Sequence, residues 1–304
     1  IFYCAGVWIE QELATASVDA AMIATDAVDT AEIKAGAVDT EELATGAVTP
    51  SKVNIPGFVQ RPTFTWNADS TFVYISPFIY DHQGTTNQLV YSHSSINYQF
   101  GSGGSNSDST NLAGGDWFYL YIDDSAVDTA GTNLIAVAQL LAVAEEPVKS
   151  EAKHGRYGSA AAGNATADDR CIGAFRTGAT PGILEFFHEG DLCLFADAIE
   201  VLSATVISTT WIDVTFIAPC FATKIEMNIE GVYDNANTTV FWRTNGQTGG
   251  TGHRIGIIHT DAPRLSLQIQ VISDSSQMIE LISADATTNT LDVNIDGWRF
   301  PIGM

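Results

Sequence analysis

Residues 265–272 read LSLQIQVI, a stretch in which apolar and polar side chains alternate from 265 to 271. Its odd positions are leucine, isoleucine or valine, while 266, 268 and 270 are serine or glutamine. Successive side chains of a β-strand point to opposite faces of the sheet, so one face here is buried and the other meets water. The stretch therefore predicts a strand of an antiparallel sandwich.

Similar β-rich runs flank this stretch throughout the last third of the chain. The segment GQTGGTG at 246–252 separates two of them, and it lacks the Lys-Ser/Thr ending of a phosphate-binding loop, so we expect a hairpin loop. Seven short strands in about 100 residues fit a β-sandwich or jelly roll. The expected strands are 211–218, 224–232, 239–243, 253–259, 265–272, 278–283 and 291–300.

The middle of the chain is also rich in β-branched and aromatic residues. We expect strands at 72–79, 89–91 and 117–122, separated by clusters of Gly, Ser, Asn and Asp. The stretch 101–115 is dominated by such residues and predicts a loop. Residues 134–144 fit either a short helix or a buried strand.

The N-terminal end follows a different period. Residues 27–54 read AVDTAEIKAGAVDTEELATGAVTPSKVN, and the ten-residue unit extends back to residue 7. Apolar residues recur every five positions, which matches neither a continuous helix, nor a heptad, nor a strand. The regular positions are Val18, Ile23, Val28, Ile33, Val38, Leu43, Val48 and Val53.

Each unit carries the signals of one short capped helix. Asp29 and Asp39 can cap a helix start, with Glu32 and Glu42 three residues on, and glycines at 36 and 46 suit its end. A helix this short is unstable alone in water. We therefore expect an oligomeric stalk whose regular apolar positions face a shared axis; a solvated acidic leader is the alternative.

Composition limits the function classes. The 304 residues carry a formal net charge of −23, which disfavours nucleic acid and anionic membrane surfaces as partners. With 45% hydrophobic residues the chain is too apolar to be disordered, and no apolar run is long enough to insert into a membrane. Cys171, Cys193 and Cys220 lie in apolar surroundings and predict buried free thiols, although a disulfide between two of them remains open.

No sequence motif indicates catalysis, a metal site or a cofactor. The chain lacks HExxH, GxSxG and nucleotide-binding fingerprints, and its six histidines are scattered. The adjacent acids at 123–124, 145–146 and 168–169 are a poor signal for paired catalysis, since neighbours on a strand point to opposite faces. We therefore expect no enzyme activity, no metal and no cofactor.

A binding surface is the more plausible kind of site. Aromatic rings flanked by Arg or Asn can stack on a sugar and hydrogen-bond it, although core packing is the alternative role of such rings. The candidates for receptor or glycan binding are Trp242, Arg243, Tyr233, Asn235, Trp298 and Arg299.

Two features resemble bacteriophage fibre proteins. The repeat AVDTEELATGAVTPSKV looks like those in the shafts of phage tail fibres and head fibres, and this resemblance implies a homotrimer. The segments GDWFYLYIDDS at 115–125 and DDRCIGAFRTGATPGILEFFHEGD at 168–191 look like a module near the C-termini of phage fibres. Trp8 and Ile9 depart from the repeat, which puts the stalk geometry there in doubt.

Together these observations predict a mainly β chain in three parts: a repeat stalk at 1–56, a β-rich domain at 57–197 and a C-terminal β-sandwich at 198–304. We expect a structural fibre of a phage virion, assembled in the host cytoplasm and probing the host surface. Its expected partners are two further copies, tail or capsid proteins at its N-terminal end, and a host-surface glycan or protein. A tail fibre is preferred; a head fibre, a glycan-cleaving spike and a bacterial adhesin are the alternatives.

Overall fold

The computed structural model describes residues 2–4, 7–9, 59–101, 112, 114–131, 133–159, 165–232, 238–250, 252–258, 264–284 and 290–304. The chain divides into two compact units, 1–49 and 50–304. In the first, β1 (Phe2–Cys4) and β2 (Val7–Ile9) form an antiparallel hairpin. The predicted capped helices and axial positions, from Val18 to Val53, lie outside the described residues.

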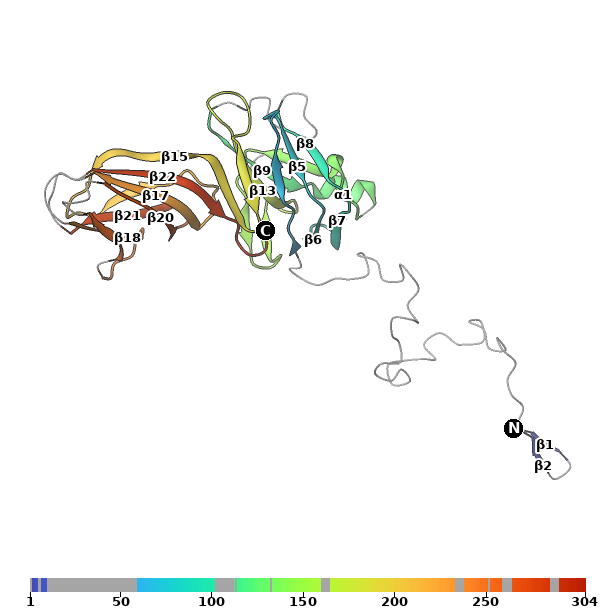
Figure 1. The fold of residues 1–304 in the computed structure, drawn as a ribbon. Coiled ribbons are helices and arrows are strands. Elements are labelled where there is room, and N and C mark those ends of the chain that lie inside the picture. The colour runs from blue at the N-terminus through green and yellow to red at the C-terminus, as the bar shows by residue number, and fades with distance from the viewer. Residues whose placement is uncertain are drawn as a thin grey trace. The chain divides into compact units, whose positions relative to one another are not determined.

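The second unit is mainly β, as the sequence predicts, and its C-terminal part, from β14 onward, is a pair of sheets (Figure 1). One sheet has the order β14-β15-β22-β17-β20 and the other β16-β21-β18-β19. When the strands β15 to β22 are numbered 1 to 8, the strand order is 1-8-3-6 in the first sheet and 2-7-4-5 in the second. This is the connectivity of a jelly roll. The strands are β14 (Phe186–Glu189), β15 (Leu192–Val206), β16 (Ile212–Thr215), β17 (Lys224–Val232), β18 (Thr238–Thr244), β19 (His253–Ile258), β20 (Arg264–Ile272), β21 (Met278–Ser283) and β22 (Thr290–Arg299).

Alternation explains why these strands form a sandwich. In β21 and in most of β22 every second residue is buried, including Ile279, Leu281, Leu291, Val293 and Ile295. The intervening residues, which are polar on β22 and mixed on β21, remain partly exposed, so each strand contributes one apolar face to the interior.

Three further sheets make up the rest of the second unit. Their orders are β3-β6-β7, β4-β5-β8 and β10-β9-β13-β12-β11. The expected strand 72–79 is two strands, β5 and β6, because Pro77 lies between them and supplies no backbone N–H. The strands are β3 (Val59–Gln60), β4 (Phe64–Trp66), β5 (Phe72–Ile75), β6 (Phe78–Gln83), β7 (Asn87–Ser92), β8 (Ile96–Gln99), β9 (Trp117–Ile122), β10 (Leu140–Val143), β11 (Val148–Ser150), β12 (Gly155–Tyr157) and β13 (Arg170–Arg176).

The described residues contain one α-helix, α1 (Asp124–Ala130). The Asp123 side chain caps its start by accepting a hydrogen bond from Ala126 N, and Gly131 ends it with a φ of 61°. The ambiguous stretch 134–144 contains the 3₁₀ turn η3 (Val137–Gln139) followed by β10.

One strand crosses the expected domain boundary. The division expected between residues 197 and 198 falls inside β15, which pairs with β14 at one end and follows β22 along most of its length (Figure 1). The core is also shared: the ring of Trp298 on β22 lies 5.2 Å from Trp117 on β9 and 5.1 Å from Phe195. Residues 50–304 thus form one compact unit with a continuous core.

Two arginines, one just after β3 and one on β13, hold residues 301–304 in place. Arg61 donates from Nη2 to Pro301 O at 2.9 Å and from Nε to Met304 O, while Arg170 donates from Nη2 to Gly303 O at 2.7 Å. Residues 301–304 are therefore held over the core by hydrogen bonds from the two arginines to their backbone carbonyl groups, and not by strand pairing.

Candidate functional site

The residue pair Trp242–Arg243 lies on β18, and its two side chains face different ways. Trp242 is opposite the buried Leu281, whereas Arg243 is opposite Glu280 on the outer face of the sheet. The predicted pair is therefore not one continuous surface, because neighbours on a strand alternate.

Arg243 belongs to a stacked cluster on that outer face. Its guanidinium carbon lies 4.1 Å from the ring centroid of Trp211, and its Nε and Nη2 donate to the two oxygens of Glu280 at 2.7 and 2.9 Å. This bidentate hydrogen bond raises the pKa of Arg243. The guanidinium of Arg243 is already paired with the Glu280 carboxylate and stacked on the Trp211 ring. The cluster therefore stabilises the sheet surface and leaves no free cation for a ligand.

Trp242 is half-buried beside the glycine-rich hairpin loop. Its ring centroid lies 4.7 Å from that of His253 on β19. Gly252, with a φ of 76°, has no room for a side chain, since a Cβ there would lie 2.6 Å from Trp242 O and 2.8 Å from the Trp211 ring. The segment 246–252 is thus the predicted hairpin loop, and Trp211 packs over its last residue.

Trp298 is a core residue in this fold. It is 1% exposed and packs against Trp117, Phe195 and Phe300, so its ring face is closed to a ligand. Arg299 faces outward, where it donates to Glu226 at 2.8 Å and to Asp191 at 2.9 Å. Tyr233 and Asn235 lie outside the described residues.

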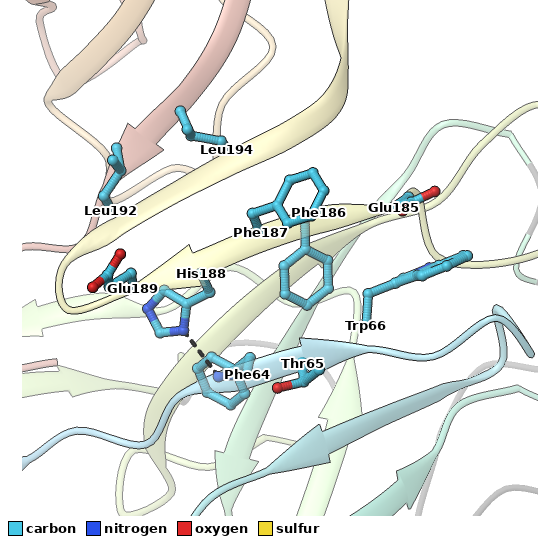
Figure 2. Close-up of a pocket in the computed structure, with 10 residues that line it drawn as sticks. All are labelled: Phe64, Thr65, Trp66, Glu185, Phe186, Phe187, His188, Glu189, Leu192 and Leu194. Atoms are coloured by element: carbon cyan, nitrogen blue, oxygen red, sulfur yellow. Dashed lines mark hydrogen bonds between the residues drawn. The ribbon is translucent and has the colours of Figure 1, made fainter.

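A groove that the sequence did not single out lies beside β14 (Figure 2). Its volume is about 410 Å³, and it is lined by β4, by β14 with the residue before it, and by the start of β15. Residues 185, 187 and 189 are exposed and alternate with the buried or half-buried 186 and 188. The alternation Glu-Phe-Glu was the sequence signal that could have indicated this surface.

The floor of the groove is fixed by His188. Its Nδ1 accepts a hydrogen bond from Phe64 N at 2.9 Å, and its ring lies between those of Phe64 and Phe300, at 5.3 and 5.1 Å. Burial and then the nearby charge of Arg61 lower the pKa of His188 to about 4. The imidazole is therefore neutral at pH 7 and serves as a hydrogen-bond acceptor for β4.

The acid pairs at 123–124 and 168–169 have structural partners. Asp124 Oδ1 lies 2.8 Å from His82 Nε2, and Asp124 Oδ2 accepts from Thr85 Oγ1 at 2.7 Å. Asp169 accepts from the backbone N–H groups of Asp124 and Thr166. Asp168 pairs with Lys153 at 2.6 Å. These carboxylates hold loops and α1 in place.

No family model matches the chain, and no curated protein matches it. Among the described residues no group of three or more His, Cys, Asp and Glu side chains is placed to hold a metal ion. Cys171 and Cys193 are buried free thiols and Cys220 is a half-buried one, and burial raises the pKa of all three. No helix in the described part of the chain is long and apolar enough to span a membrane.

Proposed function

We propose that this chain is the subunit of a structural fibre of a phage virion, with three copies per fibre, and that it contributes to adhesion to the host surface. The repeat at 7–54 forms the shaft, and its N-terminal end meets tail or capsid proteins. Attachment to a tail is preferred. The protein acts by positioning weak binding sites in three copies, so that avidity multiplies their affinity.

One observation carries this proposal most directly. The two segments that resemble the phage fibre module are distant in sequence, yet their strands β9 and β13 are antiparallel neighbours, with Trp117 opposite Arg176 and Tyr121 opposite Cys171. Both strands are almost entirely buried. Residues that resemble one module thus form one structural unit, as expected if the resemblance reflects a shared fold.

The jelly-roll order of the last eight strands supports an adhesive role for the end of the chain away from the repeat. This arrangement supplies a rigid scaffold whose faces and loops can vary without disturbing the core. The carboxylates of Asp124, Asp168 and Asp169 are engaged in hydrogen bonds and an ion pair that hold loops and α1, and this favours adhesion over glycan cleavage.

The test combines solution mass with cell binding. Light scattering on the full chain should give a mass near three times 32.5 kDa. The same measurement on residues 50–304 shows whether assembly requires the repeat. Fluorescently labelled full chain should also bind selectively to strains within a panel of bacteria. A monomeric full chain that binds no strain would contradict the proposal.

A further inference from the structure

We propose that the groove beside β14 binds an oligosaccharide that is uncharged or carries amino groups. This inference rests on the proposed function, because it names the ligand class through which adhesion would occur. The predicted candidates on β18 and β22 are not among its lining residues, although Arg299 on β22 is paired with Leu192 at its edge. The open surface of the groove is formed by Trp66, Glu185, Phe187, Glu189, Leu192 and Leu194.

The apolar part of the groove is already arranged for a flat ligand. Phe187 is 61% exposed, and Leu194 lies directly opposite it on β15, so both side chains are on the outer face of the hairpin. Trp66 is oriented by a hydrogen bond from its Nε1 to Ile183 O at 3.0 Å. A ring fixed before binding, as that of Trp66 is, loses little entropy when a sugar's C–H face packs on it.

Two carboxylates flank the exposed ring. Figure 2 shows Glu185 at the Trp66 end of the groove and Glu189 at the His188 end, with Phe187 between them. Both glutamates are exposed, and neither side-chain carboxylate has a hydrogen-bond or ion-pair partner among the described residues. An ionised carboxylate only accepts hydrogen bonds, so the complementary ligand presents hydroxyl or ammonium donors.

The same charges define what the groove rejects. Phosphate, sulfate and sialic-acid carboxylate groups would meet two free negative charges, in a chain whose net charge is −23. The groove also binds rather than cleaves. Positions 185 and 189 are four residues apart along an extended segment, or roughly 13 Å, beyond the separation of the two acids in glycoside hydrolases.

The test measures binding of the full chain to three soluble probes by calorimetry: oligomers of N-acetylglucosamine, oligomers of glucosamine and polysialic acid. We expect binding to one or both of the first two and none to polysialic acid. Phe187→Ala should weaken this binding about tenfold or more, the scale of an aromatic anchor. The double variant Glu185→Gln/Glu189→Gln should weaken binding of the glucosamine oligomer more than that of the acetylated one.

Tyr74→Ala is the matched control, since Tyr74 is an exposed ring on β5 outside the groove lining, and it should bind as the parent does. The inference is overturned if none of the probes binds, if polysialic acid binds best, or if Phe187→Ala binds normally. A lower solution mass of Phe187→Ala would also overturn it, by making the groove an interface between copies.

Cell binding separates the two proposals. A parent chain that binds the probes but no cells refutes adhesion. A Phe187→Ala variant that still binds cells refutes the role of the groove.

Discussion

Replacing Arg170 by methionine tests whether the buried guanidinium holds the second unit closed. Arg170 is fully buried and donates to the carbonyl oxygens of Asp81 and Gly303 and to the Tyr157 hydroxyl, the last at 3.2 Å. Its guanidinium carbon also lies 5.1 Å from the ring centroid of Tyr80. Arg170→Met keeps an unbranched apolar chain but removes every donor and the positive charge.

The size of the effect follows from what remains behind. Losing a hydrogen bond from a charged donor costs about 1.5–3 kcal/mol, and the partly buried bond to Gly303 O lies at the low end of that range. A desolvated cation–π contact adds up to about 2 kcal/mol. Relief from burying a cation offsets part of this loss. We expect a net loss of about 3 kcal/mol in the free energy of unfolding, which lowers Tm by roughly 6–12 °C in a domain of this size.

The assay is urea unfolding of the full chain followed by tryptophan fluorescence, at one fixed protein concentration because assembly would add to stability. Arg254→Met is the control, since Arg254 on β19 is exposed. Its midpoint should stay near that of the parent. Equal midpoints for the parent and Arg170→Met, or equal losses for both variants, would refute the reasoning that the hydrogen bonds of Arg170 close the core.

Three further predictions follow from other parts of the chain. Burial opposes ionisation of Asp124, but hydrogen bonds from His82 and Thr85 outweigh it and lower the pKa to about 2, below the ordinary 3.8. The stability that the ionised Asp124 contributes is complete above pH 4 and is lost as the pH falls toward 2. The unfolding midpoint of Asp124→Asn should therefore change less than that of the parent across this pH range. Gly297→Ala should destabilise the fold in thermal unfolding, because the new Cβ would lie 2.1 Å from Cys193 O; an unchanged Tm would contradict this backbone contact. Val38→Asp with Leu43→Asp should dissociate the full chain, or a stalk fragment, in light scattering; an intact oligomer of the fragment would refute the axial assignment.

The strands of the C-terminal third could be predicted from sequence because alternation there is regular. The expected 224–232 and 278–283 coincide with β17 and β21, and 265–272 differs from β20 by one residue. The helix α1 was not predicted, because its seven residues are too few for a periodic pattern and Asp123 looks like a loop charge.

The site was harder to predict, because one extra residue reverses which face a side chain occupies. Opposite β17, Glu226 pairs with Gly297 and Met227 with Ile295, so Asp296 is the extra residue of a β-bulge. Beyond it the parity changes, and Trp298 turns into the core instead of outward. The groove depends on β4, more than a hundred residues from β14, and a pattern within one segment cannot show such a neighbour.

The fifteen residues of β15 have a mechanical consequence. In the proposed fibre, force would pass along the chain between the particle and the surface it touches, and flexible linkers between domains normally absorb part of such a force. Here the strand that leaves β14 is the same strand that enters the jelly roll, and it is bonded to β22 on both sides of residue 197. Tension entering residues 50–304 would therefore be shared by many ladder hydrogen bonds sheared together. The ladder is interrupted between Leu194 and Ile199, so at that point the load passes between the two halves through the backbones of β15 and β22 and through the shared core.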